Sequence, residues 1–380
     1  MIAPPLDPGS PPSDPGSPRL DPITQRRRFA KRRARRRRLV ASLAGLVGVA
    51  IVVVLLAGGG EGKGGGVDTS QRGDSRARAH ARESPSGANT TTPPAGTPAA
   101  MTVSQTGLLP APVQDMAAAV VGPDRFLLMG GIDRSEASVA DILQASPTGA
   151  QRIGTLPQAL HDASASTLGA AVYLFGGGVV SSFPQITRID GAGATSPAGQ
   201  LPTPASDVAT AAIGNTVYIV GGYTGVTPLR TILAWRPGTA ARVVATLPKP
   251  LRYAAVAAAG GKLTIAGGTS GEEASRDIYR FDPISGSLAR IGLLPHPLTH
   301  AAAAAFGGTV YVFGGREASP TSQTDRILAI EAGGKIRPAG LMPTALSDLA
   351  AVALCESVVL AGGRDGAGVT QRAILTTKPS

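Results

Sequence analysis

The chain has few of the side chains on which cross-linking, metal binding and covalent catalysis usually depend. Its 380 residues include one cysteine, four histidines and one tryptophan, and aromatic residues make up 4% of the sequence. A single thiol cannot form an intrachain disulfide, and without a Cys-x-x-Cys pair a structural zinc site is not expected. The Gly-x-Ser-x-Gly elbow of many serine hydrolases is also absent. We therefore expect no metal and no cofactor.

Outside one short run, the chain also has little excess of positive charge. Residues 26–38, RRRFAKRRARRRR, hold ten Arg or Lys in thirteen positions, and the formal net charge of the whole chain is +11. The remainder is close to neutral, whereas a nucleic-acid-binding surface needs basic residues spread over the fold. We expect no nucleic-acid ligand.

The basic run is followed at once by an uncharged apolar segment, residues 39–57, LVASLAGLVGVAIVVVLLA. As a helix this segment would rise about 28 Å, close to the roughly 30 Å hydrocarbon thickness of a bilayer. The sequence thus predicts a transmembrane helix that serves as an uncleaved signal anchor. Because basic residues stay on the cytoplasmic side, we expect a single-pass cell-membrane protein with its N-terminus inside and residues 58–380 outside. Arg26 to Arg38 are expected to contact anionic lipid headgroups as well.

Two alternatives for this region stay open. Arg26 to Lys31 match the pattern RR-x-F-x-K of twin-arginine export signals, and a cleaved signal peptide would also place the rest outside. A cleaved secretory signal normally has an apolar stretch of about 7–15 residues, which is shorter than the segment here.

The segments on either side of residues 39–57 are rich in Pro, Gly, Ser and Thr, a composition that predicts disorder. We therefore expect a disordered cytoplasmic tail (1–38), the transmembrane helix (39–57), a flexible tether (58–100) and an ordered region (101–380).

The ordered region consists of six copies of one unit. In each copy an apolar run ends in two glycines, and these pairs recur every 45 to 48 residues. The first glycines of the pairs are Gly130, Gly176, Gly221, Gly267, Gly314 and Gly362. A Leu-Pro pair, or Met-Pro in the last copy, keeps the same period, and short Ala-rich and aliphatic strands separated by Gly turns fill each unit. A period in the mid-forties with four short strands per unit predicts the blades of an all-β propeller.

The two ends of the ordered region complement each other. The last unit stops at QRAILTTKPS, its third strand, and the stretch MTVSQTGLLP at residues 101–110 stands before the first unit. We expect this N-terminal strand to complete the sixth blade and close the ring, which also removes open sheet edges. The predicted fold is therefore an all-β, six-bladed propeller.

On these marks the region resembles the kelch family. The resemblance rests on the doubled glycine after an apolar strand, the Leu-Pro entry, and the aromatic residues Trp235 and Tyr279 in third strands, although most third strands have Ile or Leu instead. It covers residues 101–380. Kelch propellers include interaction modules, a copper radical oxidase and a bacterial sialic acid mutarotase, so the resemblance leaves the function open.

The best candidate site is a ring of six positions, each five residues after a Leu-Pro or Met-Pro proline, at the start of the first strand of a blade. The ring residues are Asp115, Asp162, Asp207, Tyr253, His300 and Asp348. Since first strands are innermost, these side chains should surround one mouth of the central channel, where they could bind a cation, an amine or a sugar. The alternative is that each Asp caps backbone N–H groups of a turn, a structural device copied with the repeat. Arg252, Arg316 and Arg364 are expected on the same face.

The favoured function is a binding module for a protein, peptide or glycan on this face. The alternative is a sugar-modifying enzyme of the mutarotase type, which needs only an acid–base pair such as His300 with a ring Asp. Copper radical chemistry of the family type needs a Tyr–Cys cross-link, and Cys355 is predicted in a turn on the opposite face. The Ala-, Gly- and Arg-rich composition is typical of a high-GC bacterium.

Overall fold

A computed structural model describes residues 100–271 and 273–379 of the chain. The predicted cytoplasmic tail and transmembrane helix, and the tether up to residue 99, lie outside the described residues. Among the residues that the structure describes, no helix is long and apolar enough to cross a membrane.

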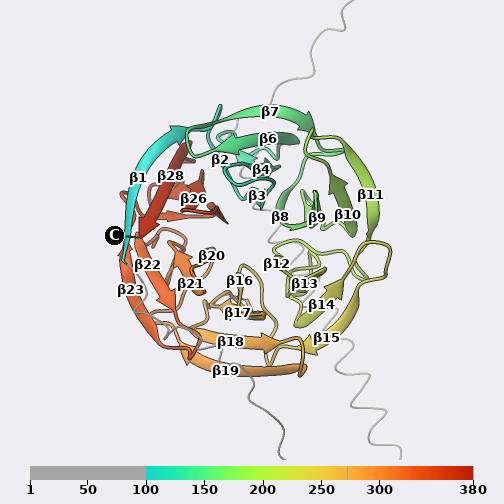
Figure 1. The fold of residues 1–380 in the computed structure, drawn as a ribbon, viewed down its shortest axis with the longest axis vertical. Coiled ribbons are helices and arrows are strands. Elements are labelled where there is room, and N and C mark those ends of the chain that lie inside the picture. The colour runs from blue at the N-terminus through green and yellow to red at the C-terminus, as the bar shows by residue number, and fades with distance from the viewer. Residues whose placement is uncertain (1–99, 272, 380) are drawn as a thin grey trace, which may run out of the picture. The chain divides into compact units, whose positions relative to one another are not determined.

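The described chain forms six four-stranded antiparallel sheets arranged in a ring around a central channel, which confirms the predicted propeller (Figure 1). Blade 1 consists of β3 (Ala117–Val120), β4 (Phe126–Met129), β6 (Asp141–Ser146) and β7 (Gly149–Thr155). Blade 2 consists of β8 (His161–Leu168), β9 (Ala171–Gly178), β10 (Gln185–Ile189) and β11 (Thr195–Gln200). Blade 3 consists of β12 (Ala209–Ile213), β13 (Thr216–Val220), β14 (Thr231–Trp235) and β15 (Arg242–Thr246).

The second half of the ring repeats this plan, with one change in the last blade. Blade 4 consists of β16 (Ala255–Ala259), β17 (Lys262–Ala266), β18 (Asp277–Asp282) and β19 (Ser287–Leu293). Blade 5 consists of β20 (Ala302–Phe306), β21 (Thr309–Phe313), β22 (Arg326–Ile330) and β23 (Ile336–Leu341). Blade 6 consists of β25 (Ala350–Ala353), β26 (Val358–Ala361), β28 (Ala373–Pro379) and β1 (Met101–Leu108). Two short ladders at the ring mouth pair β2 (Val113–Gln114) with β5 (Ile132–Asp133) and β24 (Leu346–Ser347) with β27 (Arg364–Asp365).

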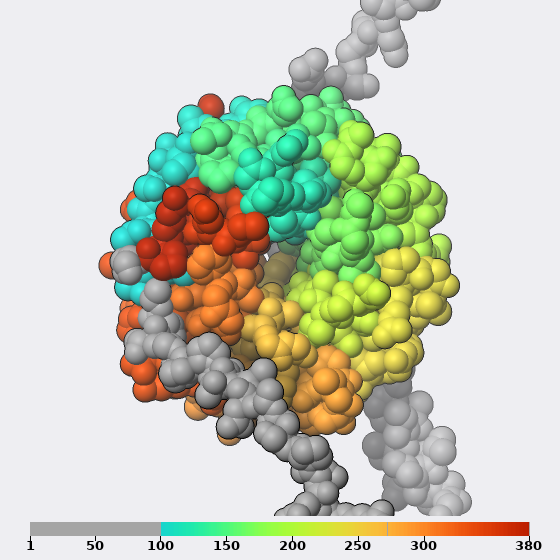
Figure 2. Space-filling model, in the orientation of Figure 1, coloured from blue at the N-terminus to red at the C-terminus, as the bar shows by residue number. Residues whose placement is uncertain are grey.

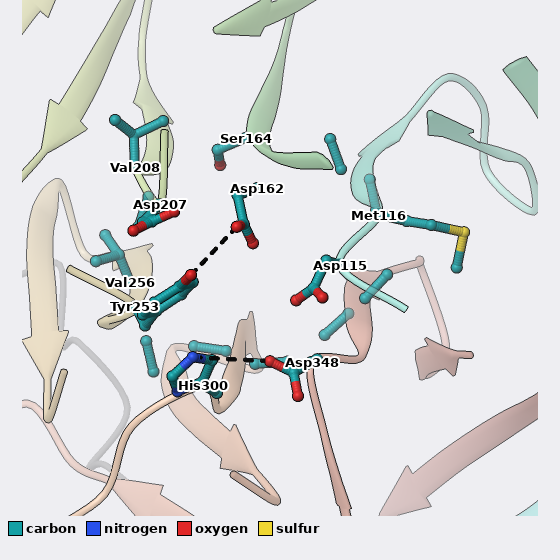
Figure 3. A pocket seen from close by; sticks show the side chains of 18 of the residues that line it. Asp115, Met116, Asp162, Ser164, Asp207, Val208, Tyr253, Val256, His300 and Asp348 are labelled. Carbon is teal, nitrogen blue, oxygen red and sulfur yellow. Dashed lines mark hydrogen bonds and ion pairs between the residues drawn. The ribbon is translucent and has the colours of Figure 1, made fainter. Parts of the chain in front are cut away.

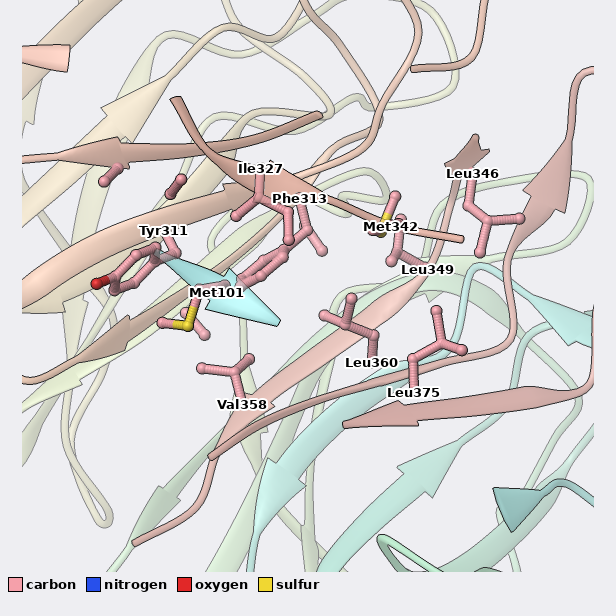
Figure 4. Packing of buried hydrophobic residues seen from close by; sticks show 14 residues of the cluster. Met101, Tyr311, Phe313, Ile327, Met342, Leu346, Leu349, Val358, Leu360 and Leu375 are labelled. Carbon is pink, nitrogen blue, oxygen red and sulfur yellow. The ribbon is translucent and has the colours of Figure 1, made fainter. Parts of the chain in front are cut away.

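The closure predicted from the two chain ends is confirmed. β1 supplies the outermost strand of blade 6 and pairs antiparallel with β28, from Met101 opposite Pro379 to Leu108 opposite Ala373. The side chain of Met101 is buried in the cluster between blades 5 and 6, beside Tyr311, Phe313 and Val358 (Figure 4). The first strand of the described chain thus joins the last.

The doubled glycines connect each blade to the next. Gly221 and Gly222 have φ of +59° and +110°, and the N–H of Gly222 donates to the carbonyl of Leu251, in the entry to blade 4, at 2.8 Å. A Cβ on Gly221 would overlap that same carbonyl oxygen. The equivalent contact recurs at all six pairs, so the sequence mark is a site of close backbone approach between blades.

Six apolar clusters, one at each interface between neighbouring blades, make up the core. The Leu or Met of every Leu-Pro or Met-Pro pair is buried in one of them; Leu109 lies in the cluster that joins blade 6 to blade 1, and Trp235 lies in the cluster between blades 2 and 3. The first strands, which converge on the axis, are rich in Ala because six strands can approach one axis only with small side chains. They leave a hollow at the centre of the ring (Figure 2).

Candidate functional site

The six ring residues occupy one mouth of this channel in a conformation that the sequence did not reveal. All six have left-handed backbone conformation, with φ between +53° and +59°. The N–H of each donates to the carbonyl of the ring residue in the preceding blade at 2.8–3.4 Å, and the sixth bond, from Asp115 to Asp348, closes the circle. A circle of six backbone hydrogen bonds therefore holds the mouth open.

The repeated device is this backbone circle and not the side-chain caps considered above. In the part of the chain that the structure describes, none of the four ring carboxylates accepts a bond from a backbone N–H. Asp and His tolerate left-handed φ better than most residues, which accounts for five of the six positions. Tyr253 is the exception, since a bulky residue in this conformation is strained. The ring side chains are thus left free for other contacts.

The ring side chains project into a cavity of about 230 Å³ whose deeper walls are mainly the Ala-rich first strands (Figure 3). Their order around the mouth is uneven. The four acids belong to blades 6, 1, 2 and 3, which are consecutive, and Tyr253 and His300 belong to blades 4 and 5. The mouth therefore has an acidic arc facing an aromatic wall.

Two arginines neutralise the two ends of the acidic arc. Arg252 Nη2 lies 2.6 Å from Asp207 Oδ2, and Arg316 Nη2 forms an ion pair with Asp348 Oδ2. The side chains of Asp207 and Asp348 are 2% and 1% exposed, so these charges are held out of water and need their partners. Ser347 tightens the second pair by accepting from Arg316 Nε at 3.0 Å and donating to Asp348 Oδ2 at 2.6 Å.

The aromatic wall is a stack whose faces are already occupied. The rings of Tyr253 and His300 are stacked with centroids 3.7 Å apart, and the guanidinium of Arg252 lies 4.5 Å from the Tyr253 centroid. At these distances the His300 imidazole and the Arg252 guanidinium cannot both lie on the same face of the Tyr253 ring. One of them therefore covers each face. Its hydroxyl donates to Asp162 Oδ2 at 3.2 Å across the mouth and accepts from Arg252 Nη2 at 2.9 Å. The wall presents ring edges and polar atoms to the cavity.

Among the described residues, no arginine or lysine forms an ion pair with either of the two middle acids, Asp115 and Asp162. Burial raises the pKa of Asp115 well above its ordinary value, and the nearby carboxylates of Asp348 and Asp162 raise it further, against a weaker effect of Arg316. Burial likewise raises the pKa of Asp162, with Asp207 and Asp348 adding to the rise, while the Tyr253 hydroxyl opposes it. These two carboxyls are the ring groups most inclined to hold a proton.

His300 is neutral over the whole physiological range. Burial lowers its pKa to about 4; Asp348 opposes this shift, and the positive charges of Arg316 and Arg252 add to it. Its Nε2 lies 4.0 Å from Asp348 Oδ1 (dashed in Figure 3), and its Nδ1 is buried without a hydrogen-bond partner. A buried ring nitrogen without a hydrogen-bond partner is costly.

Of the nine residues predicted for the site, the structure brings eight together. Arg252 and Arg316 contact ring carboxylates as described, but Arg364 does not reach the ring: its guanidinium lies against Gly368, in its own loop. Sequence reasoning missed His161, whose Nε2 is 3.6 Å from Asp162 Oδ2, and also Ser347 and Tyr223, over which Arg252 is stacked. His161, Arg252 and Ser347 share one signal, since each directly precedes a ring residue.

The groups around the mouth do not form a metal site. His296 and His300 have His-x-x-x-His spacing but lie in a non-helical entry segment, and His296 is exposed away from the ring. Within the described ranges no three His, Cys, Asp or Glu side chains converge closely enough to hold a metal ion. Cys355 is exposed in the turn between β25 and β26, at the opposite end of the channel from the ring.

Comparison with known proteins agrees with the architecture. The family model described as Kelch motif matches residues 204–241, which run from the entry of blade 3 through its third strand. The propeller is of the kelch type. A solved structure titled "Structure of YjhT" is similar to this kelch-type propeller with a TM-score of 0.62 and 12% identity, covering 70% of this chain and 95% of that one. At that identity the likeness shows the fold alone. No curated protein sequence matches the chain.

Proposed function

We propose that the kelch-type propeller is a binding module that takes up part of a protein, peptide or glycan in the ring mouth of its channel. The observation that carries this proposal is the convergence of six ring side chains on one cavity of about 230 Å³, with two of the ring carboxylates paired with arginines. Pockets that combine an apolar wall with a few convergent polar groups are the usual form of a ligand site. The strained backbone of Tyr253 supports a ligand rather than a purely structural ring.

The proposal predicts a loss of binding when the ring is altered without disturbing its backbone. In His300→Asn the new side chain tolerates left-handed φ but removes the imidazole that lines the cavity. We expect ligands captured by the full-length protein on peptide and glycan arrays to bind at least about 10-fold more weakly to this variant, the equivalent of roughly 1.4 kcal/mol.

The matched control is His296→Asn, the same substitution at an exposed histidine outside the ring. Circular dichroism of both variants would show that the fold is retained. If array ligands bind His300→Asn, Asp207→Asn and the unaltered protein equally, the ring is not the binding site.

One observation favours a second function, a sugar-modifying enzyme that uses the same mouth. Asp162 and Asp115 have raised pKa values and His300 a lowered one, so the mouth holds a protonated acid and a neutral base at the same pH. Such opposed environments are typical of acid–base pairs. Against it, the faces of Tyr253 are not available for stacking on a sugar ring. Faster interconversion of sugar anomers by the full-length protein, followed by NMR and lost in His300→Asn, would favour the enzyme.

We further propose that residues 39–57 anchor the protein in the cell membrane, with Arg26 to Arg38 on anionic lipid in the cytoplasm and the propeller outside. The support for this is the sequence order of basic run and apolar segment. An outside propeller would display the ring to extracellular partners.

Cys355 reports this topology because it is the only cysteine of the chain and is exposed. We expect a membrane-impermeant maleimide to label it in intact cells to the same extent as after lysis. A Cys355→Ser variant gives the background. Labelling that appears only after lysis would place the propeller in the cytoplasm.

A further inference from the structure

We propose that the group bound in the ring mouth is an organic cation, a primary ammonium on an aliphatic stem, held between Asp115 and Asp162. This inference rests on the proposed binding function and names the chemistry of its ligand. A lysine side chain of a partner protein and a free aliphatic amine share this chemistry.

The first argument is the balance of charge around the mouth. Four carboxyl groups face two guanidinium groups, and each guanidinium is in direct contact with one acid at an end of the arc. Among the described residues, the imidazole beside a middle acid is that of His161, 3.6 Å from Asp162, and burial lowers its pKa, which favours its neutral form. Asp115 and Asp162 therefore have no cation from the described chain, and without a ligand each favours its protonated form, hydrogen-bonded to Asp348 and Asp207 respectively.

The second argument is the direction of these side chains. Asp115 and Asp162 both point into the open centre of the mouth, and the Tyr253 hydroxyl lies on the Asp162 side (Figure 3). An ammonium group has three donors and no acceptor. Asp115, Asp162 and the tyrosine oxygen can accept one bond each.

The third argument is the wall that the stem of the ligand would touch. Beyond the ring the cavity is lined by Ala-rich first strands with Ser164 and Thr210, whose hydroxyls are hydrogen-bonded to each other at 2.9 Å. An aliphatic stem fits the alanine surface, whereas most hydroxyls of a sugar would face methyl groups that cannot bond them.

Competing cations and neutral ligands fit less well. A divalent metal needs several oxygen ligands within about 2.6 Å of one point, and in the described part of the chain no three suitable groups meet. An ammonium group tolerates acceptors spread over a wider mouth because its hydrogen bonds span 2.7–3.2 Å. A neutral ligand would leave the two middle acids protonated, so its binding would release no protons.

A proton balance follows from this geometry. Asp115 is faced by Asp348, Asp162 and Arg316, and Asp162 by Asp207, Asp348, Tyr253 and His161. In both cases burial and neighbouring acids favour the protonated form, and an entering cation favours the ionised form. Binding should therefore release protons, and affinity for the cation should rise as the pH is raised from 5 to 8.

Isothermal titration calorimetry of the full-length protein with 1-aminopentane and 1-pentanol tests the inference. We expect the amine to bind at least about 10-fold more tightly than the alcohol and to release protons, measured from the heats in two buffers of different ionisation enthalpy. Asp115→Asn and Asp162→Asn should each weaken the amine about 10- to 100-fold, as expected for loss of a charge-assisted bond. Asn keeps the left-handed conformation, so the backbone circle is preserved.

Asp124→Asn is the matched control, because Asp124 is 71% exposed, forms an ion pair with Arg125 and lies outside the ring. A capped Gly-Lys-Gly peptide and its Nε-acetylated form separate the two sources of the cation. If the lysine peptide binds more strongly than the free amine, the ligand is a lysine side chain of a partner protein. If the free amine binds more strongly, the ligand is a small amine. Both results support the inference.

Equal binding of amine and alcohol, or amine binding that survives both ring substitutions, would overturn the inference. So would tighter binding of calcium than of the amine. Any of these outcomes would still be compatible with the proposed binding function, provided that the His300→Asn variant no longer binds the ligands found on the arrays. If that variant also retains its array ligands, the binding function itself fails.

Discussion

Gly221→Ala is expected to lower the free energy of unfolding by about 3 kcal/mol. The residue has φ of +59°, and a left-handed alanine costs roughly 1–2 kcal/mol relative to glycine. Its Cβ would also overlap the Leu251 carbonyl oxygen, which the N–H of Gly222 must reach, and overpacking of this kind costs about 1–3 kcal/mol. Urea denaturation followed by circular dichroism would measure the loss.

Gly149→Ala serves as its control. Gly149 lies at the start of β7 without positive φ, and nothing lies within 4 Å of its Cβ position. We expect this variant to unfold within about 0.5 kcal/mol of the unaltered protein, as surface substitutions usually do. If both variants lost the same free energy of unfolding, the effect would come from replacing a glycine in general and not from the contact between blades.

Deletion of β1, residues 101–108, is expected to leave the ring open and the protein aggregation-prone. The deletion removes the partner of β28 along the whole of that strand and takes Met101, 4% exposed, out of the cluster between blades 5 and 6. An unpaired strand edge is a template for association with other chains. Light scattering and thermal unfolding should show oligomers and a lower, broader transition.

If loss of ring closure is the only effect of the deletion, a separate peptide that replaces β1 should restore the folded monomer. A synthetic peptide of residues 101–110 should add as the fourth strand of blade 6 and restore a monomer, because main-chain pairing carries most of such an interaction. Deletion of eight residues from the preceding segment, 80–87, controls for chain length. A β1-deleted protein that stays monomeric with an unchanged unfolding midpoint would contradict the role given to this strand.

The sequence predicted the number of blades, their strands and the closure because each of these is written as a local, repeated pattern. The glycine pairs and Leu-Pro steps mark backbone positions where only one geometry fits, and they recur six times. Fixed spacing then placed six ring residues at one mouth, as the structure confirms. Arg364 shows the limit of the method, since it has the same position in its unit as Arg316 but turns toward Gly368.

The order of amino acids thus determined by itself that this chain closes into a six-bladed kelch-type ring with polar residues at one mouth. Only the tertiary structure decided what those residues do there. The left-handed circle, the stack of Tyr253 on His300 and the burial of the two middle acids arise from contacts between residues of different blades. A pattern within one repeat does not specify such contacts. Charge balance in a mouth is a property of side chains brought together, so it becomes visible only when the ring is closed.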